Sequence, residues 1–291
     1  MNETSDDFRS GFVALAGRPN VGKSSLLNQM VDQKVSIVSD KTQTTRHSVR
    51  GVLNRDDVQV VLVDTPGVSK PRSALGHRLN DTAAAAWRGV DVVCVVVDAR
   101  AGIGPGDRYL VDQLLSSGLD TDNMVVVVNK IDGQKPDRIM SQLGLASQWK
   151  AAEYFPTSAF TGKGVGALAD YLASRMEQGP RWYPVETVRD TPDPVWVAEL
   201  VREQLLRVTH DEVPHSVATR VTEWEWPRVR VEILVERSSQ KGIIIGKGGN
   251  VLKDVGKRVR HQLPPGAFIE LVVNVAPNWQ HDRDAVERLG Y

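Results

Sequence analysis

The chain has 291 residues, 41% of them hydrophobic and 25% charged, which is typical of a soluble globular protein of one large domain or two ordinary ones. Basic and acidic residues are equal at 36 each, so net charge neither indicates nor excludes a nucleic-acid partner. The single cysteine, Cys94, excludes an internal disulfide, and its apolar neighbours predict a core residue. The N-terminus is polar and acidic and no apolar run is long enough to span a membrane, so we expect a cytoplasmic protein.

The first part of the chain alternates short valine-rich runs with helical patterns. Residues 1–10 are polar, and we expect a flexible N-terminus there. Within residues 11–179, we expect strands at 12–16, 58–63, 92–97, 124–128 and 153–156. Fully apolar runs between helices indicate parallel strands that are covered on both faces. The pattern predicts an α/β domain with a mixed, mostly parallel sheet, whose ligand binds at the carboxyl ends of the strands.

The pattern changes after residue 179. Four prolines interrupt residues 180–194, which lack periodicity and predict a linker. Residues 195–291 then follow an α-β-β-α-α-β order. The expected elements are a helix at 195–208, strands at 215–226 and 228–237, helices within 242–261 and a strand at 267–276. We therefore predict a second, α+β domain.

A glycine-rich segment follows the first expected strand and opens a helix. It fits G-x-x-x-x-G-K-[ST], the pattern of a phosphate-binding loop. Its residues are Gly17, Arg18, Pro19, Asn20, Val21, Gly22, Lys23 and Ser24. In such a loop the backbone N–H groups surround the phosphates, Lys23 would reach the β- and γ-phosphates, and Ser24 would ligate magnesium.

A second motif follows the expected strand at 58–63. It consists of Asp64, Thr65, Pro66 and Gly67. A carboxylate at this strand end can hold Mg²⁺, and Gly67 leaves room for its N–H to approach the γ-phosphate.

A threonine-rich loop at 41–47 lies where GTPases close over the γ-phosphate. One of its threonines should complete the magnesium shell, and we favour Thr45 over Thr44. The expected metal ligands are therefore Ser24, Thr45 and Asp64.

A third motif follows the expected strand at 124–128 and selects the base. It consists of Asn129, Lys130, Ile131 and Asp132. The Asp132 carboxylate can accept from N1–H and the 2-amino group of guanine, donors that adenine lacks at those positions. Asn129 would join the base-binding loop to the phosphate loop, and the segment of Ser158 and Ala159 can supply a backbone N–H to guanine O6. These motifs predict that the chain binds GTP and GDP.

The motifs occur in the order found in translation-factor-related GTPases, and residues 17–24, 43–47 and 64–67 resemble the Era group of bacterial GTPases. Val68, which we include in the nucleotide site, occupies the position where Ras-like GTPases carry a water-orienting glutamine. We therefore expect slow intrinsic hydrolysis that a partner stimulates. The expected catalytic residues are Lys23, Thr45, Gly67 and Asn20. Asn20 matches an asparagine with which related GTPases seat a potassium ion, so a role for K⁺ is a hypothesis by analogy.

The second expected domain carries a basic segment with a glycine break. Gly246, Lys247, Gly248 and Gly249 form G-x-x-G between two helical patterns. The flanking cations that we assign to the same site are Lys241, Lys253, Lys257 and Arg258. With α-β-β before it and a basic helix and a strand after it, the segment resembles a type II KH domain. That resemblance implies single-stranded RNA bound with its bases splayed.

A GTPase domain followed by a type II KH domain resembles the architecture of the Era family. The resemblance implies a GTP-switched protein that binds single-stranded RNA near the 3′ end of 16S rRNA and acts in assembly of the small (30S) ribosomal subunit. It also implies peripheral contact with the cytoplasmic face of the membrane, and we expect a monomer. The alternative is a C-terminal domain that docks a protein, with a purely structural G-x-x-G.

Overall fold

The computed structural model describes residues 7–209 and 213–291, and the chain forms two compact units. The first unit comprises the described residues up to Ser36, then Thr45–Lys70 and Leu79–Asp190. The second comprises Ile37–Thr44, Pro71–Arg78 and the described residues from Thr191 to Tyr291. The division at 190/191 falls within the segment that we predict to be a linker.

The first unit is built on a mixed sheet in the order β2-β3-β1-β4-β5-β6, with β7 beside β1. The strands are β1 (Arg9–Ala16), β2 (Val49–Asn54), β3 (Val58–Asp64), β4 (Val92–Asp98), β5 (Met124–Asn129), β6 (Glu153–Pro156) and β7 (Glu177–Gln178). Only β2 and β7 run antiparallel to their neighbours in this described sheet, so the mostly parallel sheet is confirmed.

The N-terminal boundary differs from the expected one. Residues 1–6 of the segment that we expected to be flexible lie outside the described residues. Its later part is ordered, because β1 begins at Arg9 and Phe8 is 3% exposed. Strand β2 is an addition to the expected set, and it pairs with β3 from Val49↔Asp64 to Asn54↔Gln59.

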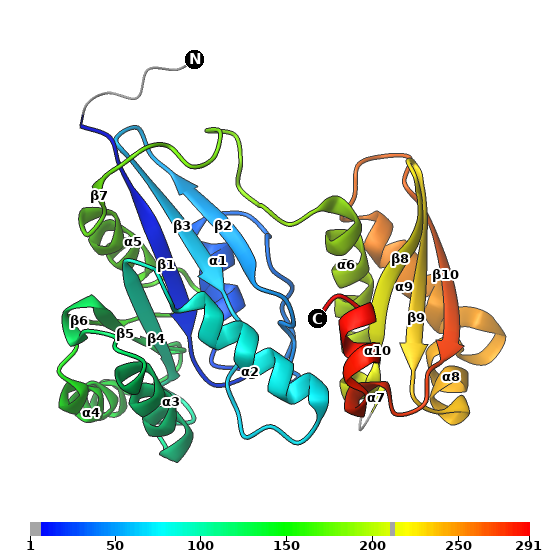
Figure 1. The fold of residues 1–291 in the computed structure, drawn as a ribbon, viewed down its shortest axis with the longest axis horizontal. Coiled ribbons are helices and arrows are strands. Elements are labelled where there is room, and N and C mark those ends of the chain that lie inside the picture. The colour runs from blue at the N-terminus through cyan, green and yellow to red at the C-terminus, as the bar shows by residue number, and fades with distance from the viewer. Residues whose placement is uncertain (1–6, 210–212) are drawn as a thin grey trace. The chain divides into compact units, whose positions relative to one another are not determined.

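Helices cover both faces of this sheet (Figure 1). On one face, α1 (Lys23–Met30) and α5 (Val165–Ser174) place Leu26 and Leu168 in a cluster with Leu15. On the other, α2 (Ala74–Ala86), α3 (Pro105–Ser116) and α4 (Pro136–Ala146) pack through Ala83, Leu110 and Ala146. Each fully buried leucine contributes about 1.5–3 kcal/mol. The 3₁₀ turns η1 (Thr121–Asn123) and η2 (Ser147–Trp149) precede β5 and β6.

The second unit contains a three-stranded sheet in the order β10-β9-β8 (Figure 1). Its elements are α6 (Asp193–Val208), α7 (Val213–Ser216), β8 (Ala218–Glu225), β9 (Arg228–Val235), α8 (Ser238–Ile245), η3 (Lys247–Gly249), α9 (Asn250–Arg260), β10 (Phe268–Val275), η4 (Trp279–His281) and α10 (Arg283–Arg288). Strand β9 is antiparallel to β8 and parallel to β10. Leu200, Ile244 and Val255 bring α6, α8 and α9 into one core with β9. The predicted α-β-β-α-α-β order is present. The strand expected at 215–226 begins later, because 215–216 belong to α7 and β8 starts at Ala218, and α10 is added after β10.

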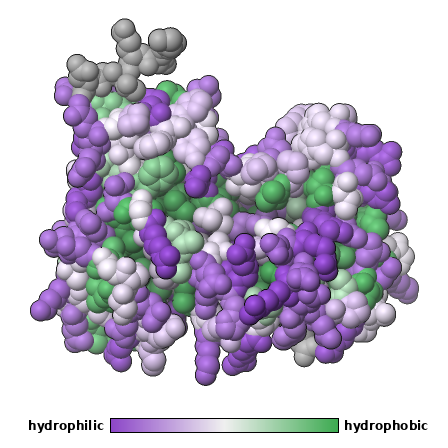
Figure 2. All heavy atoms as spheres, viewed as in Figure 1, coloured by the Kyte–Doolittle hydropathy of each residue, from purple (hydrophilic) through white to green (hydrophobic). Residues whose placement is uncertain are grey.

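The visible surface is mainly hydrophilic. Figure 2 shows hydrophilic side chains over most of the face drawn, with smaller hydrophobic groups between them. In the part of the chain that the structure describes, every helix is too short or too polar to cross a bilayer.

Candidate functional site

The phosphate-binding loop connects the end of β1 to the start of α1. Lys23 lies inside the loop with 6% of its surface exposed, and its Nζ donates to the carbonyls of Gly17 and Arg18, both at 3.2 Å. Burial lowers the pKa of Lys23 to about 8, and the nearby Asp64 carboxylate opposes that shift. A phosphate placed here would favour the charged ammonium. The loop therefore holds a cation that an anionic ligand can stabilise.

Other loop residues anchor the loop to the rest of the unit. Arg18 points toward α3, where its Nε pairs with Asp107 Oδ1 at 2.7 Å and its Nη2 donates to the Gly102 carbonyl at 3.2 Å. Val21 is buried in the hydrophobic cluster with α1. Asn20 has a left-handed backbone, with φ of 64°, and its carbonyl accepts from Lys130 Nζ. The Arg18 side chain thus anchors the loop through Asp107 and the Gly102 carbonyl.

Asp64, at the carboxyl end of β3, gathers three hydroxyl groups. Its Oδ2 accepts from Ser24 Oγ at 2.6 Å, Ser36 Oγ at 2.9 Å and Thr45 Oγ1 at 3.3 Å. Ser24 and Thr45 also share a hydrogen bond of 2.8 Å. The Thr44 hydroxyl instead donates to the Lys41 carbonyl at 2.6 Å. The geometry therefore favours Thr45 over Thr44 as a member of this group.

The same cluster has the chemistry of a magnesium site. Burial raises the pKa of Asp64, while Lys23 and the hydroxyl donors oppose the shift. Asp64 Oδ1 is buried and has no hydrogen-bond partner among the described residues. Mg²⁺ prefers hard oxygen ligands and usually takes only one or two carboxylates. Ser24, Thr45 and Asp64 therefore fit Mg²⁺, and Ser36 is a neighbour that the sequence analysis missed.

The segment after Asp64 lies against the phosphate loop. Thr65 Oγ1 donates to the Leu15 carbonyl at 2.9 Å, and Pro66 follows it. A Cβ on Gly67 would lie 2.5 Å from the backbone nitrogen of Pro19, closer than real Cβ contacts come. The Val68 N–H donates to the Gly17 carbonyl at 3.2 Å, and its side chain is buried. The backbone at position 67 therefore lies so close to the phosphate loop that only glycine fits there.

Asn129 joins the base-binding loop to the phosphate loop, as the sequence predicts. Its Nδ2 donates to the Val21 carbonyl at 3.0 Å. Its Oδ1 accepts from the Ala159 N–H at 3.0 Å and from Thr157 Oγ1 at 3.2 Å. The Ser158 N–H donates to the Lys163 carbonyl at 2.9 Å. Both N–H groups thus have partners within the chain, and a contact of either with guanine O6 stays a prediction.

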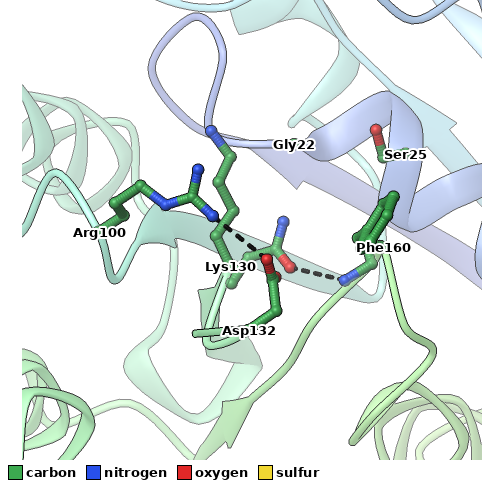
Figure 3. Close-up of a pocket in the computed structure, with 8 residues that line it drawn as sticks. Gly22, Ser25, Arg100, Lys130, Asp132 and Phe160 are labelled. Carbon is green, nitrogen blue, oxygen red and sulfur yellow. Dashed lines mark hydrogen bonds and ion pairs between the residues drawn. The ribbon is translucent and has the colours of Figure 1, made fainter. Parts of the chain in front are cut away.

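A cavity of about 530 Å³ opens between these loops, a size suited to a small-molecule ligand. Its lining residues are Gly22, Ser25, Arg100, Asn129, Lys130, Asp132, Ala159 and Phe160. Figure 3 shows Arg100 and Asp132 pointing toward each other and Phe160 beside Ser25. Ile131 is buried behind the loop. The sequence analysis missed Ser25, Arg100 and Phe160, because none of them belongs to a motif.

Charged groups converge on the cavity. Asp132 Oδ1 accepts from Ser158 Oγ at 2.7 Å, and its Oδ2 pairs with Arg100 Nη2 at 3.2 Å. Lys130 Nζ pairs with Asp98 Oδ2 at 2.7 Å. Burial by itself raises the pKa of Asp98, but Lys130 and the backbone N–H groups of Ala101 and Arg100 together lower it. The Phe160 side chain is 87% exposed. The cavity therefore contains a carboxylate that can accept hydrogen bonds from a ligand. It also contains an exposed aromatic ring that can stack on a flat base.

In the second unit, the G-x-x-G segment turns between α8 and α9. Gly246, Gly248 and Gly249 have φ of 71°, 62° and 76°. A Cβ on Gly246 would lie 2.2 Å from Asn250 Oδ1, whereas one on Gly249 would meet no described atom within 4 Å. The packing around the turn therefore requires glycine at position 246. At Gly249, the absence of a side chain leaves open space beside the backbone.

The predicted cations lie in this turn and on the two helices that flank it. Lys247, Lys253, Lys257 and Arg258 are exposed and Lys241 is half-buried. Lys253 and Lys257 are one turn apart on α9, whereas Arg258 pairs with Asp254 at 2.8 Å. Ile243 on α8 is 52% exposed and is an apolar neighbour that the sequence analysis did not single out. A basic, partly apolar surface therefore adjoins Gly249.

Each of the two units of the chain matches a known protein family. Residues 12–130 match the family model of the 50S ribosome-binding GTPase, and residues 212–280 match that of the KH domain. GTPase Era of Mycobacterium bovis is 45% identical over 98% of this chain and 99% of its own length. GTPase Era of Mycobacterium avium shows the same identity and coverage.

Two solved structures agree in fold over nearly the whole length. Era in complex with MgGDPNP and nucleotides 1506–1542 of 16S ribosomal RNA has a TM-score of 0.92 at 33% identity, covering 98% of this chain and 99% of that one. A point variant of Aquifex aeolicus Era bound to GDP and aluminium fluoride has a TM-score of 0.92 at 32% identity, with the same coverage. The matches extend through both units, and the chain belongs to the GTPase Era family.

Proposed function

We propose that this GTP hydrolase is a nucleotide-controlled RNA-binding protein. It binds single-stranded RNA near the 3′ end of 16S rRNA and acts in assembly of the 30S subunit. Two observations in one chain carry the proposal. One is the cavity lined by Asp132, a residue suited to accept from guanine, and the other is the open, basic surface beside Gly249. A family member in complex with MgGDPNP and 16S nucleotides 1506–1542 supports the pairing of these two ligands.

In the nucleotide site, each group has a distinct role. The backbone of residues 17–24 and Lys23 hold the phosphates, and Asp132 reads the base. Ser24, Thr45 and Asp64 would hold Mg²⁺, which would supply positive charge to the phosphate oxygens when bound. The Gly67 N–H approaches the γ-phosphate. Val68 offers only an alkyl side chain to the attacking water, so we expect slow intrinsic hydrolysis.

K⁺ is the additional cation that this site would accept. The support is Asn20, whose place in the phosphate loop matches the asparagine of related potassium-using GTPases. A cation there would add charge where it develops in the transition state. Hydrolysis by the full chain should be faster in KCl than in NaCl at equal ionic strength. Equal rates would exclude the role of K⁺.

The RNA site uses the turn at Gly249. The absence of a side chain there lets a sugar-phosphate backbone pass close to the start of α9, where Lys247 and Lys253 supply charge, and Lys257 adds charge one turn further along the helix. Ile243 supplies apolar surface to an unstacked base. Such contacts suit four or so single-stranded nucleotides, because duplex RNA does not present unstacked bases.

A matched pair of glycine variants tests this assignment. We expect Gly249→Asp to weaken binding of an RNA with 16S nucleotides 1506–1542, measured by fluorescence anisotropy, by at least about tenfold, since it adds bulk and a like charge beside phosphate. Gly266→Asp is the control, because Gly266 also has positive φ, 92°, and open space at its Cβ. Gly246 is unsuitable, since its replacement would clash with Asn250. Wild-type affinity in the Gly249 variant would favour the alternative, a domain that docks a protein.

The same proposal includes a cytoplasmic, monomeric protein with peripheral contact at the cytoplasmic membrane face. The support for membrane contact is the family resemblance alone. Flotation of the full chain with vesicles of anionic phospholipid, in GTP and in GDP, tests it. Absence of the chain from the vesicle fraction in both states would exclude it. Sedimentation equilibrium tests the monomeric state.

A further inference from the structure

Ser36 donates the third hydroxyl group to Asp64, and its situation differs from that of the other two. Its Oγ donates to Asp64 Oδ2 at 2.9 Å, and the residue is 1% exposed. Ser24 and Thr45 donate to the same oxygen but are also the expected ligands of Mg²⁺. A hydroxyl that ligates a metal turns a lone pair toward the ion, so its orientation depends on both the ion and Asp64. The Ser36 hydroxyl has Asp64 alone to serve.

The backbone of Ser36 is fixed by the helix that also carries Ser24. Asn28 lies one turn after Ser24 on α1, and its Nδ2 donates to the Ser36 carbonyl at 2.8 Å. Its Oδ1 accepts from the N–H groups of Val35 and Ser36, both at 2.9 Å. Val35 is buried in the same hydrophobic cluster as Leu27. Three hydrogen bonds and a buried neighbour therefore place the Ser36 hydroxyl without help from a ligand.

The Asp64 carboxylate has one crowded oxygen and one open oxygen. Oδ2 accepts from three hydroxyls. Oδ1 is buried and has no hydrogen-bond partner among the described residues. A buried polar atom of this kind calls for a partner, and a metal ion or a water bound to it would be one. Because a carboxylate is planar, a donor that holds Oδ2 also limits the directions in which Oδ1 can point.

We propose that Ser36 is a positioning residue for the magnesium site. It acts through Asp64, whose carboxylate it keeps oriented for the ion, and it contacts neither the ion nor the nucleotide. Carboxylates that bind metals are themselves hydrogen-bonded, and loss of such a partner typically weakens metal binding by about 10–100-fold. Without Ser36, the remaining donors to Asp64 are two hydroxyls that the ion itself reorients. The inference rests on the proposed magnesium site of Ser24, Thr45 and Asp64.

The test measures the dissociation rate of fluorescent GTPγS from the full chain as a function of free Mg²⁺. In Ser36→Ala, half-maximal slowing of dissociation should need at least about tenfold more Mg²⁺ than in wild type. The rate in EDTA should stay at the wild-type value, because Ser36 acts only through the metal ligand. The variant should fold, since Asp64 keeps two of its three donors.

The matched control is Ser10→Ala. Ser10 is 9% exposed, and its Oγ donates to the Pro180 carbonyl at 2.6 Å. It lies near the amino end of β1, whereas the phosphate loop follows the carboxyl end. Ser10→Ala therefore also removes a hydrogen bond of a buried serine, but its Mg²⁺ dependence should equal that of wild type.

A wild-type Mg²⁺ dependence in Ser36→Ala, or an equal shift in Ser10→Ala, would overturn the inference. Dissociation from Ser36→Ala that is faster by the same factor in EDTA and in Mg²⁺ would also overturn it, because general loosening of the site needs no ion. Asp64→Asn separates these results from failure of the site. Unchanged Mg²⁺ dependence in Asp64→Asn would refute the magnesium site and the inference with it, whereas a shift there but none in Ser36→Ala would refute the inference alone.

Discussion

Replacement of Asn129 by alanine removes the side chain that joins the base-binding loop to the phosphate loop. Three hydrogen bonds are lost, those with the Val21 carbonyl, the Ala159 N–H and Thr157 Oγ1. Asn129 is 1% exposed, so water cannot readily replace it. Each bond contributes about 1 kcal/mol net, and buried backbone groups left unpaired add about 1 kcal/mol or more. We expect the free energy of unfolding of the first unit to fall by about 3–5 kcal/mol.

Cys94 provides a local assay for that unit. It is the single cysteine of the chain and lies buried in β4. Labelling by a thiol reagent in increasing urea therefore reports opening of the first unit and is blind to the second. The matched control is Asn123→Ala, an exposed asparagine whose Oδ1 accepts one solvent-exposed hydrogen bond, from Arg175 Nη2 at 3.2 Å, so its loss should change the opening free energy by about 0.5 kcal/mol or less.

Asn129→Ala should also bind GDP more weakly, because the two loops that we propose to contact the nucleotide lose a shared anchor. An opening free energy within about 1 kcal/mol of wild type would refute the reasoning, since burial and three bonds would then contribute far less than expected.

Three further outcomes follow from the structure. Gly67→Ala adds a Cβ 2.5 Å from Pro19 N, an overpacking cost of about 1–3 kcal/mol that should weaken GTPγS more than GDP in titrations; equal weakening would contradict a γ-phosphate role. Phe160→Ala should cost about 1–3 kcal/mol of GDP binding if the exposed ring stacks on the base, and an unchanged Kd would exclude that contact. Burial raises the pKa of Cys94 from 9.0 to about 12, so its neutral thiol stabilises the fold fully below pH 9 and this contribution is lost as pH rises toward 12. Urea unfolding followed by circular dichroism from pH 8 to 11 should show that loss in wild type and less of it in Cys94→Ala; identical profiles would contradict it.

The parallel strands were predictable because both of their faces are buried. Cys94 and the valines around it form an unbroken apolar run. Such a run can be recognised as a strand without knowing which strands lie beside it. Strand β2 carries Arg50, Gly51 and Asn54 among its apolar residues and is only partly buried. Its pairing with β3 depends on tertiary contact, so its own pattern gave no clear signal.

Within the candidate site, too, some residues were predictable from the sequence and others were not. Lys23, Asp64 and Asp132 stand in motifs, since the chemistry that they perform fixes their spacing. Ser36 and Arg100 reach the site from loops, 28 and 32 residues distant from the carboxylates that they contact. Folding alone brings them there, and no local spacing predicts such a contact.

The hydroxyl cluster around Asp64 links separate parts of the first unit to one another. Ser24, Ser36 and Thr45 belong to three different segments, and one carboxylate oxygen of Asp64 accepts a hydrogen bond from each of them. The end of β3 is therefore the common anchor of these segments. Loss of the Asp64 carboxylate would loosen all three together, since hydrogen bonds to a charged acceptor are stronger than those between neutral groups.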